Sequence, residues 1–128
     1  MRLLLDTHTF LWWCADDPRL TLPVIDAVGS QENEVYLSVV SGWEIAIKSR
    51  LGRLPLPEQA GKFVRRMIER HALAVLPVNL AHTLLDADLP AIHNDPFDRL
   101  LVAQAKLEGM TLVTDDRVVT QYAVETLW

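Results

Sequence analysis

The sequence predicts an α/β fold in which helices cover both faces of a mostly parallel central sheet. Two observations predict this class. Short apolar runs alternate with segments of helical periodicity along the whole chain, and the helical segments are long enough to connect parallel strands. The 128 residues also contain no linker, repeat or low-complexity stretch. We therefore expect one three-layer α/β/α domain that spans residues 1–128.

Composition excludes several classes of protein. Half of the residues are hydrophobic and the mean hydropathy is +0.14, which is typical of a chain with a real core. The one cysteine, Cys14, rules out an internal disulfide and suits the reducing cytoplasm. Asp6 interrupts the apolar start, unlike a signal peptide, and no run approaches the roughly 18 apolar residues of a membrane span. The net charge of −5 is unfavourable for a broad phosphate-binding surface.

The first part of the chain should contain two strands and two short helices. We expect a strand at Leu3–Leu5, helices at His8–Ala15 and Leu22–Val28, and a strand at Val35–Ser38. The first strand is purely aliphatic and stops at a carboxylate, Asp6.

A capping motif marks the next helix. Ser41 and Glu44 give the S-x-x-E form of a capping box, which predicts a helix that begins there and runs to about Leu51. Trp43, Ile47 and Leu51 are spaced four apart and are expected on its buried face.

The second half continues the alternation of helices and strands. The expected elements, in order, are a helix at 60–72, a strand at 75–78, a helix at 81–88, a helix from Asp95 to Glu108, a strand at 111–113 and an edge strand within 122–127. The helix after Asp95 has the clearest start, with Asp95 as cap, Pro96 at the first position and Asp98 in the first turn.

Acidic residues follow or precede these elements where parallel sheets bind ligands, at the carboxyl ends of the strands. Asp6 ends the first strand, Glu44 begins the helix after the second, Asp98 begins a later helix, and Asp115 and Asp116 follow the Thr111 strand. Each also has a purely structural explanation: a cap, an ion pair four residues away, a favourable helix dipole, or a turn.

Taken together, the acids predict a metal site. Carboxylates about 4 Å apart repel by roughly 4 kcal/mol per pair at an effective dielectric constant near 20, more than the roughly 1 kcal/mol that a cap or helix dipole contributes. Such a cluster stays ionised only beside a cation. Oxygen ligands without cysteine or paired histidine suit Mg²⁺ or Mn²⁺.

The chain resembles a known family over nearly its whole length. The matching stretches are LLLDTHTFLWW, SVVSGWEIAIK, the G-R-L-P-L turn, LPAIHNDPFDRLLVAQA, LVTDD and the terminal Trp128. These resemble PIN-domain ribonucleases, specifically the VapC-type toxins of type II toxin–antitoxin systems. HNDPFDRLLVAQA and SGWEIAIK are the specific motifs, whereas LLLD or T-x-D alone would be weak.

The resemblance implies an acidic site made of Asp6, Glu44, Asp98 and Asp116, supported by Thr114 of the T-x-D motif. It also implies hydrolysis of RNA phosphodiesters with Mg²⁺ or Mn²⁺, a VapB-like antitoxin as partner, and a homodimer without membrane association. Asp116 is preferred to its neighbour because the family places its last acid two residues after the threonine. Asp95 is expected chiefly as a helix cap that also supports the site.

Three further residues and four cations are expected near the predicted site. His8 and His93 flank it and are expected mainly as structural hydrogen-bonding groups, and Trp12 is expected in the core or an interface. Phosphate binding is open to four basic residues near this edge, although each has an ordinary solvated charge as its simpler explanation; they are Lys48, Arg50, Arg53 and Arg99.

Other functions remain alternatives at this point. A phosphoaspartate phosphatase would need a second acid two residues after Asp6, where His8 stands, and a receiver domain would need an acid pair near the first strand. A module that binds a metal or a partner without catalysis is the main non-enzyme alternative. Its partner helix would lie in an apolar groove near Leu11, Trp12 and Leu51.

Overall fold

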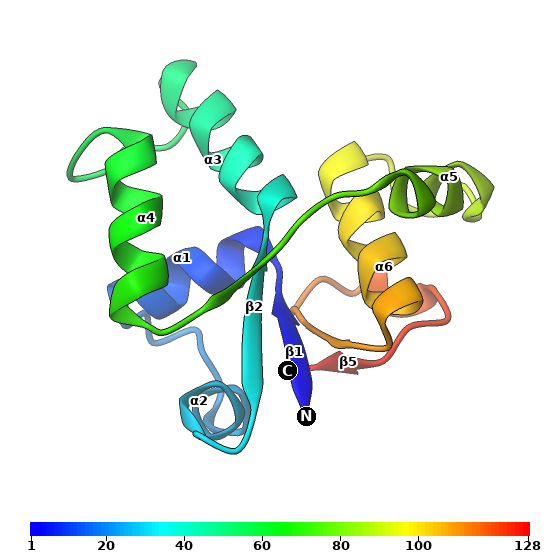
Figure 1. Ribbon diagram of the computed structural model, residues 1–128, viewed down its shortest axis with the longest axis horizontal. Coiled ribbons are helices and arrows are strands. Elements are labelled where there is room, and N and C mark those ends of the chain that lie inside the picture. Colours follow the sequence, from blue (N-terminus) through cyan, green and yellow to red (C-terminus); the bar gives the residue numbers. More distant parts are fainter.

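A five-stranded parallel sheet forms the centre of the computed structural model, which describes residues 1–128 (Figure 1). Its strands are β1 (Arg2–Leu5), β2 (Glu34–Ser38), β3 (Ala74–Leu76), β4 (Thr111–Val113) and β5 (Thr126–Leu127). The helices are α1 (Thr7–Ala15), α2 (Leu22–Gly29), α3 (Val39–Arg50), α4 (Ala60–Arg70), α5 (Leu80–Asp88) and α6 (Pro96–Glu108), with a short 3₁₀ helix at Val119–Gln121. The predicted α/β class is confirmed.

The strand order is β3-β2-β1-β4-β5, and every neighbouring pair is parallel. The chain builds the sheet outward from β1 to β3 on one side, then crosses to β4 and β5 on the other. Such a reversal leaves a crevice at the carboxyl ends of β1 and β4, where parallel sheets bind ligands. The topology therefore places one opening next to the residues that follow Leu5 and Val113.

Two separate apolar cores fill the faces of the sheet, which gives three layers. In β1, Leu3 and Leu5 belong to one core with Phe10, while Leu4 belongs to the other with Leu112, as the alternation of a strand requires. Helices α1, α2 and α4 cover the first face, and α5 and α6 cover the second (Figure 1). All three leucines are completely buried.

Helix α3 starts earlier than the capping motif predicts. Its cap is Ser38, whose Oγ accepts a hydrogen bond from the Val40 N–H at 3.0 Å, so β2 runs directly into α3. Ser41 lies inside the helix, and its predicted role as a cap is wrong. An S-x-x-E motif is also compatible with an interior position, and here the last strand residue supplies the capping hydroxyl instead.

The predicted buried face of α3 is also wrong. Trp43 is 60% exposed and Leu51 is 54% exposed, whereas Ser41 and Glu44 are buried with Val40 and Ile45. The four-residue spacing identifies a stripe but does not say which stripe meets the sheet. Here the inward side is the one whose Val40 and Ile45 pack in the two cores, and it carries Glu44 inward with it.

The remaining elements agree closely with their predicted ranges. Helix α6 has Asp95 as cap and ends at Gly109, whose φ of 66° is the left-handed conformation that favours glycine. The last strand is shorter than the 122–127 window, since Tyr122 precedes it and packs in the core. None of the helices is both long and apolar enough to cross a membrane.

Candidate metal centre

A cavity of about 400 Å³ lies where α1, α3 and α6 meet the loop after β4. Glu44, Asp98 and Asp116 line it, together with Asp95. The other lining residues are Thr7, His8, Leu11, Ile45, Lys48, Arg53 and Leu54. Asp6 is buried beside the cavity, between the end of β1 and the lining residue Thr7. The structure therefore brings the four predicted acids together from four separate parts of the chain.

Asp6 has two roles at once, one structural and one electrostatic. Its Oδ1 accepts the Thr9 N–H at 2.8 Å and caps α1, as the structural explanation predicts. Its Oδ2 lies 3.2 Å from His8 Nε2. Burial raises the pKa of Asp6, while His8 and hydrogen bonds from Thr114 and Thr9 act in the opposite direction. Burial of this carboxylate therefore carries a desolvation cost, which its hydrogen bonds and His8 partly offset.

Glu44 projects from the middle of α3 and is 5% exposed. Its Oε1 lies 2.6 Å from the Thr7 hydroxyl, and its Oε2 forms an ion pair with Lys48, four residues along the helix. Glu44 raises the pKa of Lys48 most strongly, with smaller contributions from Asp95 and Asp98. The Lys48 ammonium therefore lies within the field of carboxylates from both α3 and α6.

Asp98 shows most directly that negative charge is concentrated here. Its pKa is raised to about 7, first by burial and then by Asp95, with further contributions from Glu44 and Asp6; His93 partly offsets the rise. A carboxyl group half protonated near neutral pH is what crowding of acids without a cation produces. The repulsion expected from the sequence is therefore present in the folded chain.

Hydrogen-bond donors lower the pKa of Asp116, in contrast to the raised pKa of Asp98. Burial raises its pKa, but the hydrogen bond from His93 and a backbone N–H of Val118 outweigh burial, so the pKa is lowered. Its own N–H donates to Thr114 Oγ1 at 3.1 Å, which connects the two polar residues of the T-x-D motif. Asp115, in contrast, is exposed and lies 2.7 Å from His8 Nε2, outside the cavity lining.

His93 and Asp95 complete this wall. His93 Nε2 lies 2.8 Å from Asp116 and 3.1 Å from Asp98, and one ligand atom from each of these three residues falls within 4.8 Å of the others. Asp95 accepts the Phe97 N–H at 2.9 Å, which confirms it as the cap of α6, and it also faces the cavity. Its charge contributes to the raised pKa of Asp98.

Sequence reasoning missed or misplaced some of these contacts. Thr7 is not among the predicted site residues, although its position directly after Asp6 indicates that it lies close to the site. Arg99 was considered for phosphate binding, but its guanidinium binds the backbone carbonyls of Asp86, Leu89 and Pro90 and the Asp86 carboxylate. Arg99 therefore holds the loop before α6 in place. No sequence pattern distinguishes this structural role from contact with RNA.

An apolar cavity of about 420 Å³ adjoins the acidic one and shares Leu11 and Leu54 with it. Trp12 and Phe63 line it from α1 and α4, with the proline-rich segment 54–57 between them. Arg19 lies over the Trp12 ring at 4.3 Å from its centroid. Leu51, predicted as part of such a groove, does not line this cavity.

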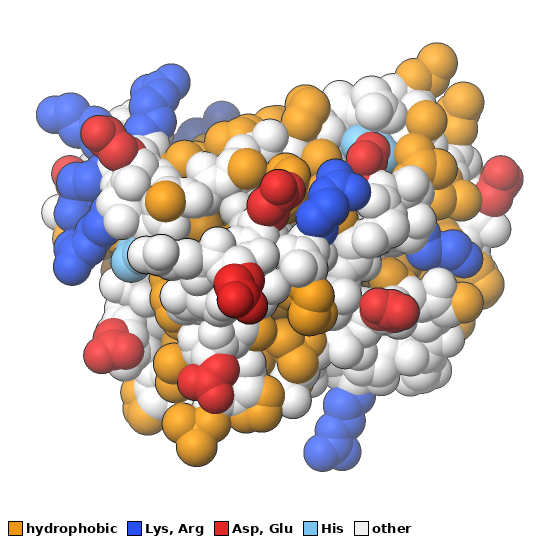
Figure 2. Space-filling model, turned by 60° about the horizontal axis from the view of Figure 1, so that its bottom comes forward, with side chains coloured by type: hydrophobic (Ala, Val, Ile, Leu, Met, Phe, Trp, Pro, Cys, Tyr) orange, Lys and Arg blue, Asp and Glu red, His pale blue; other side chains and the backbone are white.

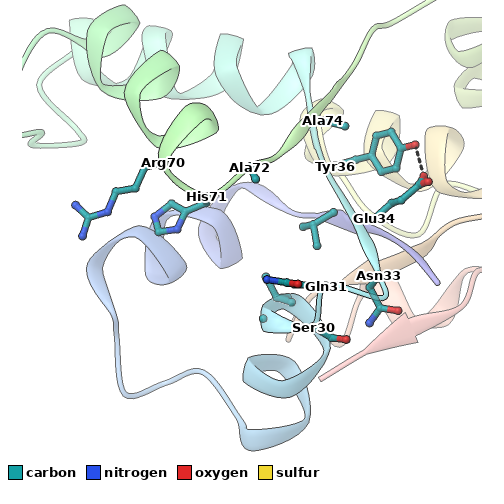
Figure 3. Close-up of a pocket in the computed structure, with 12 residues that line it drawn as sticks. Ser30, Gln31, Asn33, Glu34, Tyr36, Arg70, His71, Ala72 and Ala74 are labelled. Atoms are coloured by element: carbon teal, nitrogen blue, oxygen red, sulfur yellow. Dashed lines mark hydrogen bonds between the residues drawn. The ribbon is translucent and has the colours of Figure 1, made fainter.

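A larger cavity, of about 700 Å³, lies at the opposite end of the sheet (Figure 3). Arg70 and His71 at the end of α4 lie across from Ser30 and Gln31 after α2, and Tyr36 projects from the other side of β2 toward Glu34 (Figure 3). Tyr36 donates to Glu34 at 2.8 Å, and no group of acids converges there. In the view from the amino ends of the strands, acidic side chains lie singly while basic ones gather at one edge (Figure 2). The acidic cavity is therefore the better candidate site.

Comparison with known proteins agrees with the fold and the motifs. The model of the PIN domain family matches residues 3–125. Ribonuclease VapC22 of Mycobacterium tuberculosis is 29% identical over 117 residues, which cover 90% of this chain and 87% of that protein. Ribonuclease VapC16 of the same organism is 39% identical over 70 residues, about half of each chain.

Solved structures share the same architecture. The chain superposes on one from VapBC2 of Rickettsia felis, bound to a DNA fragment from their promoter, with a TM-score of 0.73 at 17% identity over 99% of this chain and 98% of the other. FitAcB from Neisseria gonorrhoeae gives a TM-score of 0.66 at 18% identity over 98% and 96%. At these identities the likeness concerns the fold.

Proposed function

The chain belongs to the PIN domain family, and from this premise we propose that it is a metal-dependent endoribonuclease, the toxin of a type II toxin–antitoxin pair. Two relatives named as VapC ribonucleases support this function. A single feature of the site supports it most strongly: Glu44, Asp98 and Asp116 come from distant parts of the chain to line one cavity, and Asp6 is buried directly beside it. We place the protein in the cytoplasm, in keeping with its one unpaired cysteine.

The donor set fits a hard divalent cation. The acids offer only oxygen atoms, and the pKa of Asp98 is raised to about 7 by burial and then by neighbouring carboxylates, whose charge a cation would neutralise. We propose that Asp6, Asp98 and Asp116 hold Mg²⁺ or Mn²⁺, directly or through water. When bound, the ion would lower the pKa of its water and stabilise charge on the phosphoryl oxygens.

The chain's own residues then have distinct tasks. Glu44 is placed to ligate or to accept a proton from the attacking water, and Thr7 holds its Oε1 in position. Lys48 and Arg53 stand on the cavity wall and can meet an RNA phosphate. Thr114 orients Asp6 and the backbone of Asp116.

The test is cleavage of RNA by the purified chain. Wild type with Mg²⁺ or Mn²⁺ should cut RNA, and EDTA, Asp6→Asn or Glu44→Gln should abolish cleavage while leaving the circular-dichroism spectrum unchanged. The inactive variants, purified identically, control for contaminating nucleases. If wild type cuts no RNA and Asp6→Asn still binds a partner protein normally, the non-catalytic binding module is the correct function.

The neighbouring apolar cavity is where we propose that the antitoxin binds. An apolar partner segment seated against Leu11, Trp12 and Phe63 would lead directly into the acidic cavity, because the two cavities share Leu11 and Leu54. A basic side chain at its end would meet the carboxylates and block RNA. A Leu56→Ala variant, at a half-buried residue that lines this cavity, should weaken inhibition by the antitoxin without changing cleavage by the free toxin.

We also propose that a second copy of the chain covers the outer face of α3. Val39, Trp43 and Leu51 are 47%, 60% and 54% exposed along this helix. Trp43 also packs edge-on against Phe97 of α6, with ring centroids 5.4 Å apart, which extends the apolar surface. A contiguous exposed apolar stripe of this kind is typical of an interface, and a homodimer is the commonest closed assembly.

A further inference from the structure

His93 lies between two of the proposed metal-holding acids, and its two ring nitrogens have different partners. Nε2 lies 2.8 Å from Asp116 Oδ2 and 3.1 Å from Asp98 Oδ2. Nδ1 accepts a hydrogen bond from the backbone N–H of Asp95 at 3.0 Å. A ring nitrogen that accepts a hydrogen bond carries no proton, so the proton of the neutral imidazole is on Nε2.

That tautomer decides how His93 can act toward a cation. A protonated Nε2 donates a hydrogen bond and has no lone pair to offer a metal. The separations alone, within 4.8 Å for His93, Asp98 and Asp116, would also suit a site with one nitrogen and two oxygen ligands. The backbone N–H of Asp95 distinguishes a hydrogen-bond donor from a metal ligand at His93. Ligation through Nε2 would require the ring proton to move to Nδ1, where it would meet this N–H directly.

We infer that His93 is a positioning residue that donates from Nε2 to Asp116 beside Asp98 and is not a metal ligand. This inference rests on the proposed metal site. A ring N–H placed between the two carboxylates reduces their repulsion, and its hydrogen bond fixes which lone pairs of Asp116 face the cavity. A ligand set made only of oxygen then suits Mg²⁺ or Mn²⁺ better than softer metals such as zinc.

The surrounding loop holds the ring in place before any ion binds. The backbone N–H of His93 donates to the Tyr122 hydroxyl at 2.8 Å, and that hydroxyl donates to the Pro90 carbonyl at 3.0 Å. Arg99 binds the same carbonyl at 2.9 Å. The side chain of His93 is only 15% exposed. Tyr122 and Arg99 therefore fix the loop that carries His93.

The chain contains an internal reference for this tautomer. His82 Nδ1 also accepts a backbone N–H, from Asn79 at 3.1 Å, and its Nε2 lies 3.0 Å from Glu108. Glu108 ends α6 ten residues after Asp98, about 15 Å along the helix axis. His82 should therefore show the same proton position but no response to metal.

Nitrogen NMR of the metal-free protein tests the tautomer independently of any nuclease activity. Both His82 and His93 should carry their proton on Nε2, and Mg²⁺ should leave the Nε2 proton of His93 in place. A proton on Nδ1 of His93, or loss of the Nε2 proton when Mg²⁺ is added, would overturn the inference even if RNA is cleaved.

Mn²⁺ provides the second readout. Pulsed EPR of Mn²⁺ bound to wild type should show no directly coordinated nitrogen. His93→Ala should weaken Mn²⁺ binding about 10- to 100-fold, as loss of a residue that orients ligands does, and His93→Gln, whose amide nitrogen can donate from the place of Nε2, should restore most of the affinity.

Three other results would each contradict a different claim about His93 or the metal site. A nitrogen coupling that disappears in His93→Ala would make His93 a ligand, and an unchanged Mn²⁺ affinity in that variant would exclude positioning. If wild type binds no Mn²⁺ at all, the proposed metal site fails and His93 has no role toward an ion, whatever its tautomer.

Discussion

At the scale of single residues, the site is defined by charges that oppose folding until a cation is present. Asp98 is the clearest case, since its pKa is about 7 in the folded chain and near the ordinary value of 3.8 when unfolded. The folded state therefore holds a proton on Asp98 that the unfolded state releases. Protein stability should fall as the pH rises between about 4 and 7.

The first prediction follows from this direction of the change of stability with pH. Metal-free wild type should lose stability as the pH is raised from 5 to 8, and Asp98→Asn should show a flatter dependence because the neutral amide has no proton to lose. Added Mg²⁺ should stabilise wild type more at pH 8 than at pH 6. Urea unfolding in EDTA across this pH range measures the effect, and parallel curves for the two proteins would contradict it.

A second prediction separates the two adjacent acids after β4. Asp116 lines the cavity and Asp115 does not, so Asp116→Asn should reduce cleavage by at least about 100-fold, whereas Asp115→Asn should change it by less than about threefold. The two variants differ by one position in the same loop and so control for each other. Single-turnover cleavage of a fluorescent RNA measures both rates, and equal losses would indicate a loop effect instead.

At the scale of elements, Asp95 both caps α6 and raises the pKa of the neighbouring Asp98. Asp95→Asn should keep the cap, since asparagine also caps well, and should lower the pKa of Asp98 by removing a negative neighbour. Asp95→Ala should remove the cap as well and cost about 1 kcal/mol of stability. Urea midpoints and NMR titration of Asp98 distinguish the two variants, and equal stabilities would show that the cap contributes nothing.

Elements with a local signal were predictable from the sequence, and those that depend on tertiary contacts were not. Asp95, Pro96 and Gly109 mark both ends of α6 through local chemistry alone. The start of α3 depends instead on Ser38 at the end of β2, and its buried face depends on the cores that Val40 and Ile45 join, which no local pattern contains.

The candidate site followed the same division. Strand-end positions and helix starts were enough to select Asp6, Glu44, Asp98 and Asp116. The Thr7 contact with Glu44 and the His93 contact with Asp116 join residues more than twenty positions apart along the chain. Such pairs are visible only once the topology is known.

At the scale of the whole molecule, the exposed stripe on α3 leads to a prediction about assembly. Trp43→Glu should convert a dimer into a monomer, because a charge would be buried at the centre of the proposed interface. Leu22→Glu is a matched control, since Leu22 is 73% exposed on α2, away from that face. Sedimentation at several concentrations measures the change, and a wild type that remains monomeric at every concentration would rule out the dimer.

The strand order also governs when a newly made molecule can become harmful. Asp6 is translated before the other acids of the site, whereas Asp116 follows β4, which pairs with β1 only after β2 and β3 have been made. A product that stops before β4 lacks one wall of the cavity. The cell making this enzyme is therefore exposed to its activity only once the loop after β4 has emerged from the ribosome, which leaves time for a co-expressed inhibitor to be present.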